Sequence, residues 1–276
     1  MLKKLESLFR VYFPKRMKDR HEYMAYFKGL KGLEVGGPSR VLSSKGFLPI
    51  YNVISSLDGC NFSTNTVWEG SISEGQTFRY DKNKVGRQFI AEATDLSVIG
   101  SETYDFVLSC HSLEHIANPI KAILEWKRVT RNGGYILFVL PHKDRTFDRK
   151  RPLTTLEHMI DDYEQGKGEE DNTHFEDAIN LHDVSMDPGL KDPGLLAERT
   201  ANNFENRCVH HHIFNTPLLL KLVDYNGLKI LKASLFTPFN IIVLAQKLKD
   251  GNIDNSAFLD RENPLFNNSR FPSDRL

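Results

Sequence analysis

Residues 32–39 read GLEVGGPS, a short apolar run that contains an acid and stops at two glycines. The run predicts a strand ending at Val35, and Gly36 and Gly37 predict a turn at which the backbone can approach a ligand closely. Further apolar runs follow in which apolar residues do not alternate with polar ones. This pattern is typical of strands buried on both faces of a parallel sheet. These runs span residues 48–57, 104–108 and 135–140.

Helical patterns lie between and after these runs. One begins at Pro119, repeats apolar residues at helical spacing and ends at the glycine pair 133–134, as helices with proline at the start and glycine past the end do. Another begins at Thr216 and precedes two more strand patterns, 228–235 and 240–246. Strands that alternate with helices predict an α/β fold with a Rossmann-like, doubly wound sheet.

The composition excludes several classes of protein. The 36 Lys+Arg balance 36 Asp+Glu, so no electrostatic attraction to a nucleic acid is expected. The longest apolar runs are far shorter than the ~20 residues of a membrane-spanning helix. Three cysteines are too few for a disulfide framework, and the N-terminus does not have the pattern of a secretory signal. We therefore expect a cytoplasmic protein.

Charge is distributed unevenly and divides the chain. Residues 1–29 are basic and predicted to be helical, and residues 30–247 form the main domain. Residues 143–212 are acidic and rich in histidine, which predicts an insertion, or lid, after the fifth strand. Residues 248–276 are polar and aperiodic, so we expect a loosely attached tail.

Polar residues at the strand ends are the candidates for ligand binding, because open α/β sheets bind ligands beyond the carboxyl ends of their strands. Glu34 precedes the glycine turn, and Asp58 follows about twenty residues later at the expected end of the second strand, where a carboxylate suits ribose hydroxyls. Further along come EATDLS at residues 92–97 and YDFVLSCHSLEHI at residues 104–116.

The order of these motifs resembles the class I S-adenosylmethionine-dependent methyltransferases. The resemblance covers residues 30–140 and resumes at 213–246, and it implies a seven-stranded sheet whose last strand is antiparallel. One departure is that Pro38 and Ser39 stand where the family's first motif usually has a third glycine. The absence of a Gly-x-Gly-x-x-Gly motif makes a nicotinamide-dependent oxidoreductase the weaker alternative.

The resemblance also implies which residues contact S-adenosylmethionine. Asp58 would bind the ribose, Glu92 and Ala93 the adenine, and the remaining residues the methionine portion. The predicted cofactor-binding residues are Glu34, Gly36, Gly37, Asp58, Glu92, Ala93, Ser109, Cys110 and His111.

A base is expected if the methyl acceptor is a hydroxyl, because a hydroxyl is a poor nucleophile until its proton is removed. Histidine suits this role, since its ordinary pKa of about 6.5 leaves it partly neutral. The candidates are His111, His115 and His142, with a histidine of the insertion as a further one. His115 has the alternative role of packing on the sheet.

The insertion is expected to bind the acceptor, since the strand ends are occupied by the cofactor. We predict substrate contacts from His158, Asp162, His182 and His211. The segments LEVGGPS, SLDGCNF, NTVWEG and TTLEHMIDDY are also similar to bacterial methyltransferases of surface-glycan biosynthesis, such as lipopolysaccharide synthesis. This implies O-methylation of a sugar or glycan precursor. A small metabolite or quinone-like lipid acceptor and a non-catalytic scaffold in glycan assembly are the alternatives.

A divalent metal is considered for the same insertion. His158 and Asp162 are four residues apart and share a face if their segment is helical, and His174, His182 and His210 are available to complete a site. The spacing matches no standard zinc motif, so a solvated acidic surface is the favoured interpretation and no metal ligand is predicted.

The basic N-terminal segment has two interpretations. It could lie on an anionic membrane as an amphipathic helix. The favoured alternative is a helix that packs over the cofactor pocket or at the subunit interface of a homo-oligomer.

Overall fold

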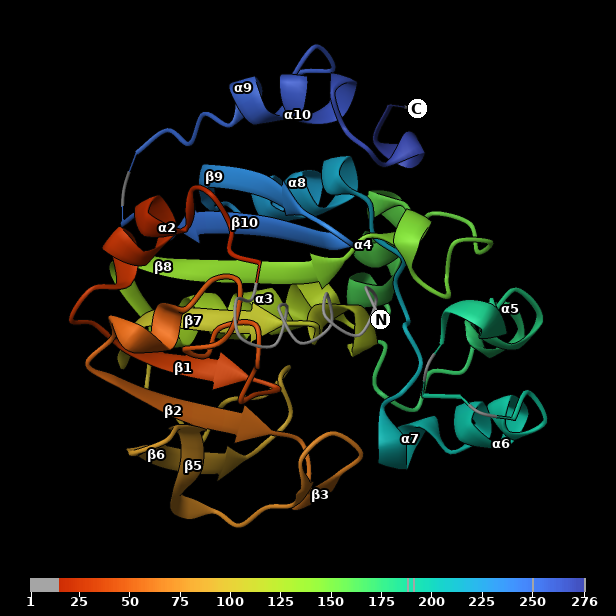
Figure 1. The fold of residues 1–276 in the computed structure, drawn as a ribbon, viewed down its shortest axis with the longest axis horizontal. Coiled ribbons are helices and arrows are strands. Elements are labelled where there is room, and N and C mark those ends of the chain that lie inside the picture. Colours follow the sequence, from red (N-terminus) through yellow and green to blue (C-terminus); the bar gives the residue numbers. More distant parts are fainter. Residues whose placement is uncertain (1–14, 188, 191, 250, 276) are drawn as a thin grey trace, which may run out of the picture.

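The computed structural model describes residues 15–187, 189–190, 192–249 and 251–275. Its centre is an eight-stranded sheet with the order β5-β6-β2-β1-β7-β8-β10-β9, and β3 and β4 form a separate hairpin (Figure 1). The strands are β1 (Lys31–Val35), β2 (Ser56–Asn61), β3 (Asn65–Thr66), β4 (Gly70–Ser71), β5 (Gly75–Asp81), β6 (Lys84–Ile90), β7 (Tyr104–Cys110), β8 (Thr130–Pro141), β9 (Lys229–Phe236) and β10 (Asn240–Gln246).

The predicted α/β, Rossmann-like fold is confirmed, with one difference in the sheet. Strands β6, β2, β1, β7 and β8 run parallel, and β10 is antiparallel to both of its neighbours. The sheet has eight strands rather than the predicted seven, because β5 pairs antiparallel with β6 and extends one edge. In β5 only Phe78 and Tyr80 are buried, so its pattern lacks the continuous hydrophobicity of the inner strands.

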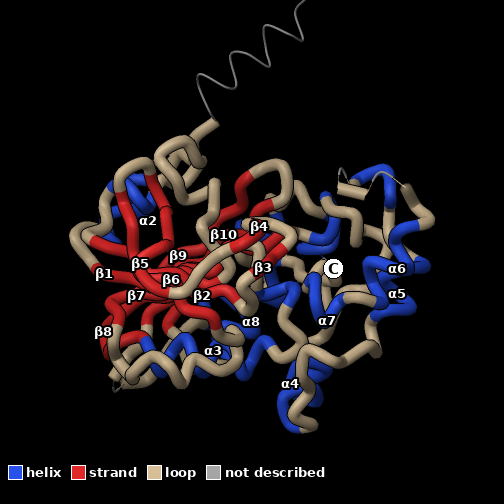
Figure 2. The backbone as a smooth tube through the Cα atoms, turned by 90° about the horizontal axis from the view of Figure 1, so that it is seen from below, coloured by secondary structure: helices blue, strands red, loops and turns tan. Residues whose placement is uncertain are grey.

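Helices cover both faces of the sheet. Figure 2 shows α2 and α3 on opposite sides of it, and α3 and α8 share one apolar core through residues such as Trp126 and Leu222. The helices are α2 (Arg20–Phe27), α3 (Pro119–Val129), α4 (Leu156–Glu164), α5 (Phe175–Asn180), α6 (Leu195–Ala201), α7 (Asn203–Asn206), α8 (Thr216–Tyr225), α9 (Ser256–Leu259) and α10 (Pro264–Asn267). The Asn118 side chain accepts a hydrogen bond from the Lys121 amide and so caps α3 at its start.

The connection from β1 to β2 contains no α-helix. Residues 48–55, which were expected to begin a strand, form turns and a short 3₁₀ segment at Ile50–Asn52 instead. Their apolar side chains pack with Phe27 of α2 in a second apolar core. This core is separate from the one that α3 and α8 share. Continuous hydrophobicity here reflects burial under the sheet, which periodicity alone does not distinguish from a strand.

The connection from β8 to α8, residues 142–215, lies at the carboxyl ends of the parallel strands and carries α4 to α7 (Figure 1). The C-terminal residues are not the loosely attached tail that was expected, because Phe266, Phe271 and Asp274 are buried against the domain. Among the described residues no helix is long and apolar enough to cross a membrane. Residues 1–14 of the basic segment, on which the membrane hypothesis rests, lie outside the described part.

Candidate active site

A cavity of about 880 Å³ opens where β1, β2, β7 and β8 end. Gly36 lines it beyond β1, Asn61 beyond β2 and His111 beyond β7. The segment 142–215 contributes residues on the opposite side, including Phe147 and His210. The cavity therefore lies between the sheet edge and the segment that follows β8, which is where an open α/β sheet binds ligands.

The glycine turn is shaped by side chains behind it. Gly36 has φ +78°, and a Cβ on Gly37 would come within 2.3 Å of the Glu34 carboxyl carbon. Glu34 is fully buried, accepts a hydrogen bond from the Ser39 amide at 3.1 Å and another from the Tyr51 hydroxyl at 2.5 Å. Burial raises the pKa of Glu34 to about 7. Glu34 does not line the cavity as predicted; it holds the turn from behind.

Asp58 also lies away from the cavity. It is in the middle of β2, where its carboxylate accepts hydrogen bonds from the Tyr104 hydroxyl and the Arg87 amide, both at 2.8 Å. The predicted strand ended at Asp58, whereas β2 continues to Asn61, and this register difference removes Asp58 from the strand end. Asn61 takes that place, with its amide nitrogen donating to the Gly37 carbonyl at 3.0 Å.

Glu92 and Ala93, for which adenine binding was predicted, line the cavity. The Glu92 carboxylate pairs with Arg207 at 2.8 Å, and the Arg207 guanidinium also lies 4.7 Å from the centre of the Phe62 ring. This corner of the cavity thus combines backbone, an aromatic ring and a paired carboxylate, which suits a flat heterocycle.

The three residues predicted at the end of β7 divide into two groups. Cys110 and His111 line the cavity, whereas Ser109 is buried, and its hydroxyl has no hydrogen-bond partner among the described residues. His111 has φ +52°, and its Nε2 lies 2.9 Å from the amide oxygen of Asn240. Burial lowers the pKa of His111 to about 4, so its ring is a weak base.

His142 is not in the cavity and cannot be the predicted base. Its ring is fully buried, lies 2.9 Å from the Asp274 carboxylate and stacks on Phe271 with ring centres 4.0 Å apart. The residue after β8 therefore fastens the C-terminal residues to the domain, an arrangement that could not be expected while those residues were interpreted as a loose tail.

A histidine of the insertion, His210, which was named above only as a possible metal ligand, is the better candidate for the base. His210 lines the cavity, and its Nδ1 lies 2.5 Å from the Asp148 carboxylate. Arg151 donates to the other oxygen of Asp148 at 3.0 Å and to the His210 carbonyl at 2.8 Å. Although burial opposes it, the Asp148 carboxylate raises the pKa of His210. The arrangement orients the imidazole in the way that a carboxylate orients a catalytic histidine.

Two further side chains adjoin His210. Glu114 is buried and His115 is partly buried, both line the cavity, and the His115 ring centre lies 4.5 Å from that of His210. Burial raises the pKa of Glu114 to about 7 and lowers that of His115 well below its ordinary value. The Nδ1 of His115 is 3.2 Å from the Val209 carbonyl, so His115 braces the segment that carries His210.

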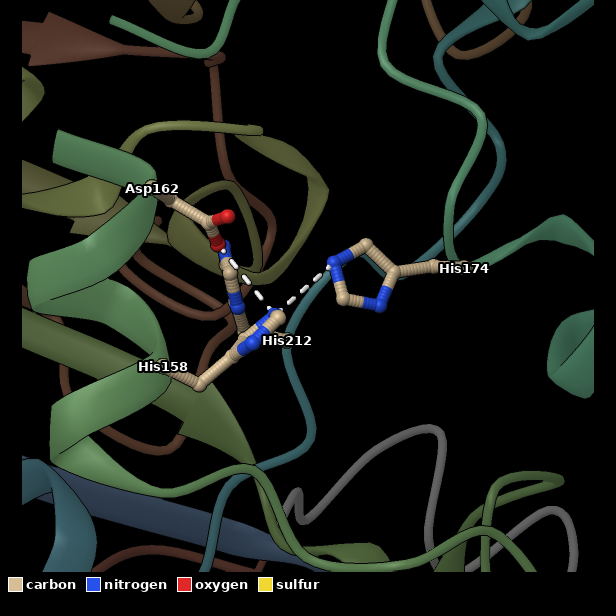
Figure 3. Close-up of side chains that lie close together, drawn as sticks. All are labelled: His158, Asp162, His174 and His212. Carbon is tan, nitrogen blue, oxygen red and sulfur yellow. Dashed lines mark hydrogen bonds and ion pairs between the residues drawn. The ribbon is translucent and has the colours of Figure 1, made fainter. Parts of the chain in front are cut away.

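None of the four predicted substrate-binding residues lines the cavity. His158 and Asp162 share a face of α4, with Nε2 and Oδ2 3.3 Å apart, and they lie close to His174 and His212 (Figure 3). His182 stacks on Phe147 with ring centres 4.5 Å apart. His211 is fully buried, and its Nε2 lies 3.2 Å from the Asn203 amide nitrogen.

The family comparison identifies the chemistry of this fold. The family model of a methyltransferase domain matches residues 57–138, which run from β2 to β8 and include the cavity residues Glu92, Ala93, Cys110 and His111. The chain therefore contains a methyltransferase domain, as predicted. This match agrees with S-adenosylmethionine as the predicted cofactor.

Solved structures of similar fold are distant in sequence from this methyltransferase. A SAM-dependent methyltransferase of Thermotoga maritima and one of Aquifex aeolicus each have 12% identity and a TM-score of 0.45, covering 89% of this chain and 96% of theirs. An S-adenosylmethionine-dependent methyltransferase of Mesorhizobium loti has 12% identity and a TM-score of 0.47, covering 82% of this chain and 95% of its own. No curated protein matches the sequence significantly.

Proposed function

We propose that this methyltransferase methylates a hydroxyl group of a sugar or glycan precursor, with His210 as the general base. The observation that carries the proposal is the Asp148–His210 pair, which faces the same cavity as the glycine turn after β1. A base is needed for a hydroxyl acceptor because a neutral hydroxyl attacks poorly.

The cofactor is proposed to lie along the sheet side of the cavity. The adenine would pack in the corner formed by Phe62, Ala93 and the Glu92–Arg207 pair. Since the Asn61 amide nitrogen donates to Gly37, the amide oxygen of Asn61 is the atom left to accept from a ribose hydroxyl. S-Adenosylmethionine supplies a methyl group already activated on its sulfonium, so the protein has to align the acceptor and remove its proton.

The proton transfer follows from the geometry of His210. In the neutral form of His210, which acts as the base, Nδ1 donates to Asp148, so Nε2 carries the lone pair and can accept the proton of the acceptor hydroxyl. As the hydroxyl oxygen forms its bond to the methyl carbon, the carbon–sulfur bond breaks and its electron pair returns to sulfur. The products are a methyl ether, S-adenosylhomocysteine and protonated His210, whose charge Asp148 stabilises.

The proposal of a sugar acceptor is supported by other groups that line the cavity. Trp68 lines the cavity, is 54% exposed and lies with its ring centre 5.2 Å from that of His115. The Asp187–Arg199 pair, with atoms 2.9 Å apart, also lines the cavity. Exposed aromatic rings and fixed polar groups together suit an acceptor with apolar ring faces and several hydroxyls.

The test is methyl transfer from isotopically labelled S-adenosylmethionine to a panel of nucleotide sugars and, for comparison, phenolic and quinol acceptors. We expect His210→Gln to lower kcat by about 100-fold or more while leaving cofactor affinity unchanged. The matched control is His21→Gln, which alters an exposed histidine of α2. Full activity of His210→Gln would exclude His210 as the general base. Methyl transfer only to phenolic or quinol acceptors would exclude a sugar as the acceptor.

A further inference from the structure

Four side chains converge outside the methyl-transfer cavity (Figure 3). His158 and Asp162 come from α4, His174 from the residue before α5, and His212 from the segment that precedes α8. One potential ligand atom of each lies within 4.8 Å of those of the other three. None of the four residues lines the cavity of the candidate active site.

We infer that His158, Asp162, His174 and His212 bind a divalent transition metal ion, with zinc as the reference ion. The Nε2 atoms of His158 and His174 are 3.3 Å apart, and the Nε2 of His158 is 3.3 Å from Oδ2 of Asp162. In a tetrahedral site with metal–ligand bonds of about 2.0 Å, neighbouring ligand atoms are about 3.3 Å apart. These two separations match edges of such a tetrahedron, and the His212 ring lies beside the same carboxylate, with its Nε2 3.8 Å from Oδ2 of Asp162.

Unpaired polar atoms inside the cluster provide independent support. His212 is fully buried and Asp162 is 4% exposed, yet Nδ1 of His212 and Oδ2 of Asp162 have no hydrogen-bond partner among the described residues. A hydrogen bond between the rings of His158 and His174 would leave both atoms unpaired. Buried polar atoms without partners are costly, and a cation bound between these side chains would offset that cost.

The surroundings of His212 are those of a metal-ligating histidine. Its Nε2 lies 3.1 Å from the Ala117 carbonyl, which can only accept a hydrogen bond, so Nε2 carries the proton and Nδ1 the lone pair. Ligating histidines typically donate their other ring N–H to a backbone carbonyl in this way. Asp171 adjoins the far side of the cluster, since a ligand atom of it lies within 4.8 Å of His174.

The ligand set favours zinc over magnesium or calcium. Three imidazoles and one carboxylate suit a borderline ion such as Zn²⁺, whereas Mg²⁺ and Ca²⁺ prefer oxygen ligands. Four protein ligands fill a tetrahedral shell and leave no position for a substrate, which makes the site structural. The ion would join α4, the loop before α5 and the segment that contains His212. His212 is two residues along the chain from His210.

The first test measures metal content of the purified full-length chain after incubation with zinc and dialysis against metal-free buffer. We expect zinc to remain in an equimolar amount. Replacement of the zinc by cobalt(II) should give the intense visible absorption of a tetrahedral site. Loss of zinc during dialysis, or only the weak absorption of an octahedral cobalt complex, would overturn the inference. Neither readout depends on methyl transfer, so the proposed function can fail or hold separately.

Variants locate the ion. His158→Ala and Asp162→Asn should abolish equimolar zinc retention, whereas the controls Asp161→Asn, on the same helix, and His21→Ala should retain it. The His158 side chain is 42% exposed, so its removal leaves the fold intact, as circular dichroism will verify, and this variant decides the question if Asp162→Asn does not fold. Equimolar zinc in folded His158→Ala protein would contradict the assignment.

Discussion

At the scale of single residues, Asp58 and Asn61 are three positions apart on β2 and have different functions. Both follow the glycine turn in sequence, but only Asn61 lies where β2 ends, and only Asn61 lines the cavity. The carboxylate of Asp58 is already engaged by Tyr104 and Arg87. Its function is to join neighbouring strands.

This difference predicts opposite effects on cofactor binding. Asn61→Ala should weaken S-adenosylmethionine binding by up to about tenfold, since it removes one hydrogen bond to the ribose. Asp58→Asn should leave the affinity unchanged because it lies outside the cavity. Titration calorimetry measures both. A larger loss of affinity in Asp58→Asn than in Asn61→Ala would restore the carboxylate as the ribose ligand.

Glu34 predicts a pH dependence of stability. Its folded-state pKa near 7 exceeds the ordinary 4.5, so the folded protein binds more protons in this range and stability falls as pH rises through it. The difference corresponds to about 3 kcal/mol. Glu34→Gln keeps the side chain neutral at every pH, so its stability relative to the wild type should increase between about pH 5 and pH 8.

The measurement for Glu34 is urea unfolding of the two proteins across this pH range. Groups other than Glu34 titrate in both proteins, so the difference between their free energies of unfolding isolates its contribution. A difference that stays constant with pH would show that Glu34 is ionised at the same pH in the folded and unfolded chains.

At the scale of elements, the sequence predicted what depends on local pattern. Strands β7, β8 and β10 follow from continuous apolar runs, and helices α3 and α8 from proline and glycine at their ends. The antiparallel direction of β10 was implied by the family resemblance and not by a local pattern. Strand β5 was missed because it is half exposed, and residues 48–55 were interpreted as strand because packing under a sheet produces the same pattern. A continuous apolar run shows that a segment is buried, but it does not by itself show whether the segment is a strand.

The prediction of a loose C-terminal tail was wrong because isolated buried residues, both polar and aromatic, attach this region without a periodic pattern. Asp274 is buried and accepts hydrogen bonds from Thr216 at the start of α8 and from Ser269, while His142 lies 2.9 Å away. No apolar periodicity marks residues 248–276. The Asp274 carboxylate accepts from or adjoins groups of three separate segments, and it acts together with the buried rings of Phe266 and Phe271.

We therefore predict that Asp274→Ala lowers the free energy of unfolding by about 3–5 kcal/mol, as expected when one partner of a buried pair is removed. Cofactor affinity, measured at a temperature where the variant is folded, should not change because Asp274 is outside the cavity. The control is Asp260→Ala, which alters an exposed aspartate of the same C-terminal region. Equal stability of the two variants would show that the C-terminal residues are not held by this carboxylate.

At the scale of the whole molecule, the cofactor side of the site was more predictable than the acceptor side. Gly36, Glu92, Ala93, Cys110 and His111 belong to motifs next to strands, whose place in the sheet fixes their position. The Asp148–His210 pair joins positions 62 residues apart in an irregular segment. Such a contact depends on the path of the chain between short helices, which no periodicity encodes.

The measurement that tests the central claim most directly is a crystal structure of the chain with S-adenosylhomocysteine. The account predicts adenine beside Phe62 and Ala93, a ribose hydroxyl at Asn61, and the sulfur on the side of the cavity that His210 faces, with space for an acceptor between them. A cofactor bound with its sulfur away from His210, or outside this cavity, would contradict both the site and the proposed base.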